Sequence, residues 1–164
     1  MIFCRMNKRA ILKKIIAKLA DELEVHLRAA RYSRDEATHE QNKPENKYDT
    51  RGLEASYLAR GQSKQLAELD ASIVEFEKLA VRKFGADDGI AIGALVALEQ
   101  FRETNFYFIG PRAGGTEVIH DKKEVLVITP QSPLGEQLAG RKAGEQPKLK
   151  FGSETRATKI ISVE

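Results

Sequence analysis

The sequence has little of what most secreted proteins and many enzymes depend on. Of its 164 residues one is cysteine, three are histidine and none is tryptophan. A single cysteine excludes a disulfide framework and any zinc site built on cysteine pairs, and a thiol without disulfides suits a reducing compartment. Aromatic residues make up 7% of the chain. That scarcity argues against a large aromatic-lined pocket.

Long apolar runs are also missing. No run approaches the roughly 18 residues of a membrane span. The start MIFCRM does not resemble a secretory signal, because its lysines follow the apolar patch instead of preceding it. The net charge of +3 is too small to indicate nucleic-acid binding by itself. We therefore expect a cytoplasmic protein with no membrane contact, and the apolar share of 41% is enough for one modest core.

The first half of the chain has the pattern of a long helix. Glycine and proline are absent from residues 7–43, and most of these residues are good helix formers. Stepping by three and four residues traces a seam that two polar residues interrupt, as in a heptad repeat. Its eight positions are Leu12, Ile16, Leu19, Leu23, His26, Ala30, Ser33 and Ala37.

A second helical pattern follows a break at Pro44, which cannot lie inside a helix. It runs from near Arg51 to about Lys83, with a seam at Ala55, Ala59, Gln62, Leu66, Leu69, Ile73, Phe76 and Ala80. Both seams have small residues beside the break and large ones far from it. This predicts an antiparallel coiled-coil hairpin over residues 1–84, with its tip at about 41–52 and arms roughly 50 Å long. A plain helical bundle or a dimerising coiled coil is the alternative, although pairing within the chain favours a monomer.

The second half changes to short apolar segments rich in β-branched and aromatic residues. They are ALVALEQF, NFYFIG, EVLVITP, LKFG and TKIISVE, separated by Gly, Pro and Asn. SPLGEQLAG is typical of a short helix, with Ser132 as N-cap, Pro133 in the first turn and Gly140 at the end. We expect an α+β protein whose residues 89–164 form a small antiparallel sheet of about five strands with one short helix.

Few residues suggest chemistry. No Ser/His/Asp triad, Cys/His pair or histidine cluster is visible, and the Gly-rich stretch 113–115 is interpreted as a hairpin turn. His26 is interpreted as a partly buried structural residue on the helix seam, and His120 as part of a solvated loop. The unusual feature is the acidic tip, whose carboxylates could share a Mg²⁺ ion that activates water for phosphodiester cleavage. A solvated polar loop is the alternative. The acids are Glu36, Glu40, Glu45, Asp49 and Glu54, interleaved with Lys43, Lys47 and Arg51.

The stretch SPLGEQLAGRKAGE (Ser132–Glu145) carries a family resemblance. With the strand VLVITP before it and LKF and ATKIISVE after it, it is similar to the C-terminal signature of Gre-type bacterial transcription elongation factors. IAIGALVAL (Ile90–Leu98) resembles the first strand of their C-terminal domain, and the resemblance covers nearly the whole chain. It implies an N-terminal coiled coil followed by an FKBP-like β-domain.

The resemblance also implies a partner and a mechanism. Such factors bind RNA polymerase, with the β-domain at the rim of the secondary channel and the hairpin tip near the active site and the transcript 3′ end. They are at most cofactors of the polymerase's own endonuclease activity. In the cleaving members a tip Asp, and a Glu three residues later followed by Asn, help to hold Mg²⁺ and a water.

The matching residues here are Asn42, Glu45 and Asn46, so an amide replaces the first acid. An amide oxygen is a poorer ligand for a hard cation and cannot act as a base. Either Asp49 or Glu40 could take that place. The resemblance therefore implies Glu45, Asp49 and Asn42 as catalytic candidates, with Glu45 and Asp49 as metal ligands.

Two functions remain open: a cleavage cofactor, or a non-cleaving channel regulator that competes with true cleavage factors, which Asn42 favours. A prolyl isomerase or chaperone is a weaker reading, because aromatic residues are scarce. Further contact candidates at the polymerase are Tyr48 and Arg51 at the tip, Ser132, Pro133 and Leu134 in the β-domain, and Lys13, Arg28, Arg31 and Arg34 toward RNA phosphates. The alternative for these basic residues is ordinary solvated charge on a coiled coil.

Overall fold

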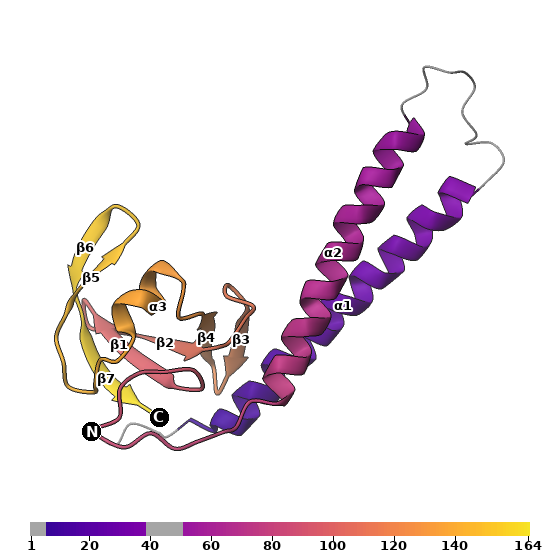
Figure 1. The fold of residues 1–164 in the computed structure, drawn as a ribbon. Coiled ribbons are helices and arrows are strands. Elements are labelled where there is room, and N and C mark those ends of the chain that lie inside the picture. Colours follow the sequence, from indigo (N-terminus) through magenta and orange to yellow (C-terminus); the bar gives the residue numbers. More distant parts are fainter. Residues whose placement is uncertain (1–5, 39–50) are drawn as a thin grey trace. The chain divides into compact units, whose positions relative to one another are not determined.

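The computed structural model of the chain describes residues 6–38 and 51–164. Two long helices come first, and a β-rich region with one short helix follows (Figure 1), so the predicted α+β class is confirmed. The chain forms two compact units. Ala17–Ile73 makes one, and the residues up to Ile16 together with Val74–Glu164 make the other. The predicted domain boundaries, 1–84 and 89–164, stay a prediction.

The unit Ala17–Ile73 contains the larger part of two antiparallel helices, α1 (Lys8–Thr38) and α2 (Arg51–Glu77). A contact fixes their pairing, because the Gln65 side-chain amide nitrogen lies 3.1 Å from Nε2 of His26. The seam predicted from the heptads faces inward over most of its length, although Ala59 on α2 is exposed. Leu19 is buried, while its partners along the seam are half-buried: Leu23, His26, Ala30 and Ser33 on α1, and Gln62, Leu66, Leu69 and Ile73 on α2.

The second helix is shorter than predicted. It ends at Glu77 instead of about Lys83. The chain leaves the helix in a tight turn, where the Leu79 N–H donates to the Phe76 carbonyl at 3.2 Å. Phe84 is then buried in the core of the β-domain. Periodicity missed this end because Leu79 and Ala80 continue the apolar spacing.

The β-rich region contains seven strands instead of the expected five or so. The main sheet has the order β3-β4-β2-β1-β7, and β5 and β6 form a separate hairpin. Their bounds are β1 Leu95–Gln100, β2 Glu103–Ile109, β3 Glu117–His120, β4 Lys123–Ile128, β5 Lys148–Phe151, β6 Glu154–Ala157 and β7 Lys159–Val163.

One pair of strands departs from the predicted antiparallel sheet. β2 and β4 run parallel, with Phe106 opposite Val125, while every other pair in the sheet is antiparallel. The chain passes from β2 to the edge strand β3 before it returns as β4. The loop 113–115 therefore joins strands that are not neighbours, and its interpretation as a hairpin turn was wrong. Two-residue hairpin turns lie instead at Phe101 and Arg102 between β1 and β2 and at Asp121 and Lys122 between β3 and β4, all four residues with positive φ.

The core of this region lies between the sheet and the short helix α3 (Pro133–Leu138). Leu138 from α3 and Leu98 and Ile160 from the sheet are fully buried in it. Gly135 lets α3 approach the preceding loop, because a Cβ there would lie 1.9 Å from the carbonyl oxygen of Thr129. Side chains at the ends of the long helices extend this packing: Phe76 lies with its ring centre 6.3 Å from that of Phe108.

Candidate functional site

The predicted catalytic and metal residues lie in the segment that joins the two long helices. Asn42, Glu45 and Asp49, together with Asn46 and Tyr48, are outside the described residues. The structure describes the flanks of this segment: α1 ends at Thr38 and α2 begins at Arg51. Among the residues that are described, no three His, Cys, Asp or Glu side chains come together as metal ligands.

The basic residues of α1 that were predicted to contact phosphates, Lys13, Arg28, Arg31 and Arg34, are exposed, as such a surface requires. Arg31 and Arg34 lie on the solvent side of the helix. Arg28 is also exposed but donates from Nη2 to a carboxylate oxygen of Glu24, one turn earlier. This hydrogen bond holds the pKa of Arg28 above its ordinary value. Its charge is therefore partly compensated within the helix, which leaves Arg31 and Arg34 as the better candidates. Lys13 is exposed too, in the other compact unit.

The two histidines named from the sequence differ from each other. His26 is half-buried on the helix seam and accepts the Gln65 amide when its Nε2 is unprotonated, which confirms a structural residue. His120 was predicted to lie in a solvated loop, and that was wrong: it ends β3 opposite Lys123 and is 8% exposed. Alternate side chains of a strand point to the same face, and His120 shares the buried face of β3 with Val118.

Exposed apolar side chains on the hairpin were missed by reasoning from the sequence. Tyr32 on α1 and Tyr57 and Leu58 on α2 are about two-thirds exposed, at 67%, 64% and 59%. None of them belongs to a heptad seam. A search for large apolar residues outside the two seams could have found them. Scattered exposed residues of this kind are common. Aromatic residues on a solvated helix are nevertheless suited to contacts with a partner.

The β-domain residues proposed to contact a partner have structural roles. The Ser132 hydroxyl donates to the Thr129 carbonyl at 2.7 Å and accepts the Gly135 N–H at 3.1 Å, so it caps α3 as predicted. Leu134 packs against the core. Pro133 is exposed in the first turn of α3. Of the three residues, Pro133 is the one whose side chain remains accessible to a partner.

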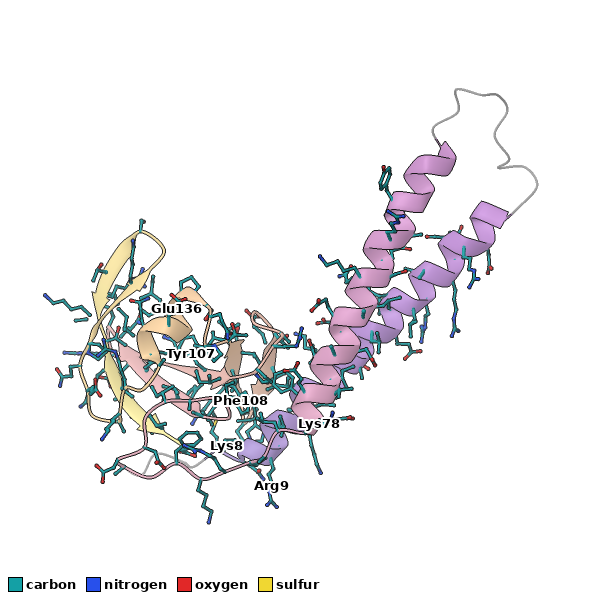
Figure 2. The ribbon with its side chains drawn as sticks, viewed as in Figure 1. Lys8, Arg9, Lys78, Tyr107, Phe108 and Glu136 are labelled. Atoms are coloured by element: carbon teal, nitrogen blue, oxygen red, sulfur yellow. The ribbon has the colours of Figure 1, made fainter. Side chains whose placement is uncertain are left out.

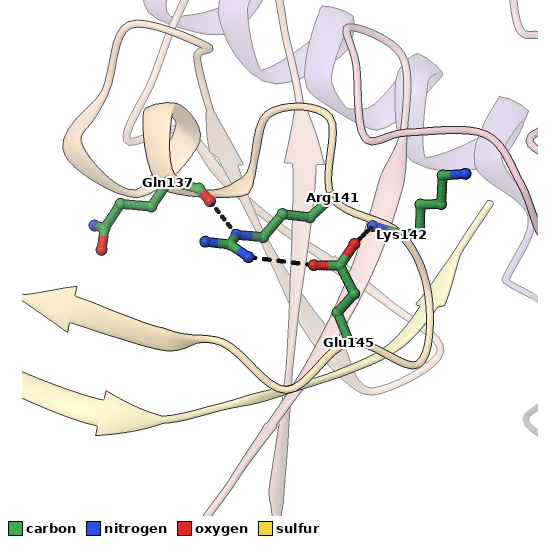
Figure 3. Close-up of polar contacts among 4 residues, drawn as sticks. All are labelled: Gln137, Arg141, Lys142 and Glu145. Atoms are coloured by element: carbon green, nitrogen blue, oxygen red, sulfur yellow. Dashed lines mark hydrogen bonds and ion pairs between the residues drawn. The ribbon is translucent and has the colours of Figure 1, made fainter.

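The turn after α3 explains the rest of the C-terminal motif (Figure 3). Arg141 donates from Nε to the Gln137 carbonyl at 2.7 Å, and its Nη1 lies 3.2 Å from Oε2 of Glu145. The Lys142 N–H donates to Oε1 of Glu145 at 2.8 Å. This backbone hydrogen bond, assisted by Arg141, holds the pKa of Glu145 below its ordinary value. Gly140 and Gly144 both have positive φ, which a glycine adopts without strain.

A comparison with family models found no match, and a comparison with curated proteins found none either. Solved structures do resemble the chain. GreA factor homolog 1 (Gfh1) of Thermus thermophilus is 18% identical with a TM-score of 0.38, over 91% of this chain and 94% of that one. Gfh1 of Thermus aquaticus is 19% identical with a TM-score of 0.40, over 92% and 94%.

A transcription elongation factor GreA/GreB from Nitrosomonas europaea is 16% identical, with a TM-score of 0.35, over 67% of this chain and 91% of that one. These structures have the names of the family that the motif Ser132–Glu145 resembles. In the part of the chain that the structure describes, no helix is long and apolar enough to cross a membrane.

Proposed function

We propose that the protein is a Gre-type transcription elongation factor that binds bacterial RNA polymerase. It inserts the tip of its hairpin into the secondary channel, while the β-domain docks at the channel rim. The observation that supports this most is that the motif SPLGEQLAG forms a capped helix on a small sheet, in the β-rich region that follows a hairpin of two long helices. α1 alone, with 31 residues, is about 46 Å long. Such an arm is long enough to carry a segment deep into a partner.

The chemistry of the tip residues suits Mg²⁺. Glu45 and Asp49 would hold the ion through carboxylate oxygens, and Asn42 would offer an amide oxygen, all of them hard ligands that magnesium accepts. When bound, the ion would supply charge that activates a water and stabilises the leaving oxygen. The protein's own part is to carry these oxygens to the polymerase. The catalytic groups of the hydrolysis otherwise belong to the polymerase, so this chain is a cofactor and not an enzyme.

The second candidate function is regulation of the channel without cleavage. Asn42 favours it, because it stands where cleaving members of the family have their first tip acid. An amide brings no negative charge and cannot accept a proton from water at neutral pH. A factor of this kind would occupy the same channel and exclude a true cleavage factor.

A transcript cleavage assay separates these functions. A backtracked elongation complex with 3′-labelled RNA is incubated in Mg²⁺ with the protein or with Glu45→Ala, Asp49→Ala or Asp70→Ala. The last variant removes an exposed acid from the side of α2 and is the matched control. Accelerated release of short 3′ fragments that both tip variants lose, and the control keeps, supports the cleavage cofactor and identifies its second acid.

The same complexes also test the alternative. If the protein does not accelerate cleavage but slows the action of an added cleavage factor, it is a channel regulator. If it does neither, and does not bind polymerase in a pull-down with purified components, the proposed function is wrong.

A further inference from the structure

Among the described residues, the most exposed large apolar side chain lies in the turn between β1 and β2. Phe101 is 81% exposed, whereas Phe108 of β2, labelled in Figure 2, is 1% exposed. Phe101 and Arg102 both have positive φ, at 49° and 69°. Two-residue turns of this kind favour asparagine and glycine, and a bulky residue in this conformation is strained. Strain and exposure together indicate that Phe101 serves a contact outside the fold.

A guanidinium group lies against the exposed ring. The guanidinium carbon of Arg156, on β6, is 5.8 Å from the centre of the Phe101 ring and 6.0 Å from that of Phe151, on β5. Glu154 orients this guanidinium, since Nε and Nη2 of Arg156 donate to its Oε2 at 3.1 and 2.6 Å. The two rings and the guanidinium form one surface, which we call the Phe101 platform.

Buried hydrogen bonds hold the parts of the Phe101 platform together. The Gln100 amide donates to the Thr158 hydroxyl at 3.1 Å, and both side chains are buried. The β5–β6 hairpin is a two-stranded sheet apart from the main one (Figure 1), and such hairpins are marginally stable alone. Gln137 of α3 fixes it by donating to the Lys150 carbonyl at 3.0 Å and accepting its N–H at 2.7 Å. The platform is therefore formed before any partner binds, which reduces the entropy cost of binding.

Positive charge is concentrated around this platform. Residues 148–159 contain four cations and one acid, a net charge of +3 that equals the net charge of the whole chain. The acid, Glu154, is already paired with Arg156. Glu99 and Glu103, at the ends of β1 and β2 that meet at the turn, offset part of the charge. The exposed cations are Arg102 in the turn and Lys148, Lys150 and Lys159 beyond it. A local excess of this sign attracts polyanions.

We propose that the Phe101 platform binds single-stranded nucleic acid, with a base stacked on Phe101 and phosphates paired with the surrounding cations. Every base has a flat face that an exposed ring can stack on, and cations beside such a ring bind the backbone without regard to sequence. A duplex is less suited, because its bases are already stacked on one another. The site lies in the β-domain and does not depend on the polymerase, so it stands or fails separately from the proposed function.

The absence of tryptophan from the chain allows a direct test. Phe101→Trp places a single tryptophan in the turn, and Ile119→Trp places one on β3 at a side chain that is 68% exposed. Each full-length variant is titrated at low ionic strength with a short single-stranded RNA without terminal phosphates. We expect saturable quenching of the Phe101→Trp fluorescence, because a stacked base quenches an indole, and at least threefold less quenching of the Ile119→Trp control. DNA of the same sequence is titrated in parallel, and tighter binding of one of the two identifies the preferred strand.

The cations are tested in the Phe101→Trp background, where quenching reports on this site alone. Arg102→Gln and Lys159→Gln change exposed side chains. Each should reduce the slope of log affinity against log salt by about 0.7, the contribution of one phosphate contact to a single strand. Lys78→Gln is the matched control, because it removes an exposed cation in the turn after α2, and it should leave the slope unchanged.

Absence of saturable quenching, or equal quenching in the two tryptophan variants, would overturn the proposal. So would salt slopes that stay the same in both Arg102→Gln and Lys159→Gln, because the phosphates would then be bound elsewhere. A polyglutamate peptide is the last probe. If it displaces the RNA and binds more tightly, the Phe101 platform is a surface for an acidic protein segment and not for nucleic acid.

Discussion

The hairpin and the β-domain are stabilised in different ways. Among the described side chains of the hairpin unit, in residues 17–35 and 57–73, Leu19 and Ser72 are the buried ones. The β-domain buries a continuous cluster, in which Leu98, Leu138 and Ile160 are fully inaccessible. The hairpin therefore depends on helix propensity and a narrow, half-buried seam, whereas the β-domain depends on close packing.

This difference suits the proposed division of work. A rod with few buried side chains can change its surface and its connecting segment at little cost in folding free energy. A tightly packed domain cannot, but it offers a fixed platform for docking. Substitutions that test packing should therefore have large effects in the second unit and small ones in the first.

The largest effect is expected for Phe76→Ala. Phe76 is fully buried against Phe108 where α2 ends, and removing a buried aromatic ring costs about 3–5 kcal/mol of unfolding free energy. Urea unfolding followed by circular dichroism measures the loss. Val74→Ala is the control, because Val74 is 37% exposed on the same helix and should cost about 1 kcal/mol or less. Equal losses in the two variants would show that this end of α2 does not belong to the packed unit.

Gly135→Ala should have the next largest effect. The added Cβ would lie 1.9 Å from the Thr129 carbonyl oxygen and 2.9 Å from the Ser132 hydroxyl. Relieving this overlap must displace α3 or its cap, at a cost of about 1–3 kcal/mol. Gly114→Ala is the control: its Cβ would meet the Thr129 side chain at an ordinary 3.5 Å. A melting temperature that falls no further for Gly135→Ala than for the control would contradict the close approach.

The same difference between the units decided what the sequence could predict. The heptad spacing of Leu19, Leu23 and His26 predicted the helix pairing, because each position depends on residues three or four away. Ser132, Pro133 and Gly140 predicted α3 and its ends, since capping is equally local. These features follow from short stretches of chain, and the structure confirms them.

Features set by distant contacts could not be predicted. The parallel pairing of β2 with β4 depends on which strand β3 joins, and no local signal specifies that choice. β6, with the sequence ETRA, lacks an apolar pattern and exists because it pairs with β5. α2 ends early, at Glu77, and the chain after it buries Phe84 in a core made by residues distant in sequence. In the candidate site, Asn42, Glu45 and Asp49 lie outside the described residues, so their convergence stays a prediction.

A smaller effect, of opposite sign, is expected in the hairpin for Gly61→Ala. Gly61 lies inside α2, and a Cβ there would meet nothing within 4 Å. Alanine should therefore stabilise the helix by about 1 kcal/mol, the difference in helix propensity. Hydrogen exchange of the α2 amides should slow accordingly. Ala67→Gly, at an exposed position of the same helix, is the reverse variant and should accelerate exchange. Unchanged exchange in both variants would contradict the conclusion that helix propensity stabilises the hairpin.

The smallest effect concerns Glu145 in the turn after α3. Its pKa in the folded protein is lowered, first by the Lys142 N–H and then by Arg141. A lowered pKa means that the carboxylate stabilises the fold fully above its ordinary pKa of about 4.3, and that this contribution disappears as the pH falls through the lower, folded value. Glu145→Gln should therefore be less stable than the unchanged protein at pH 7, and the two should converge in acid.

Urea unfolding at a series of pH values measures this difference in stability, with the exposed Glu124→Gln on β4 as the control. Because Glu145 is itself partly exposed, solvent screens the interaction, and the difference in unfolding free energy at pH 7 should be small. If that difference stays constant down to pH values well below the ordinary pKa, the side chain acts by its shape and not by its charge.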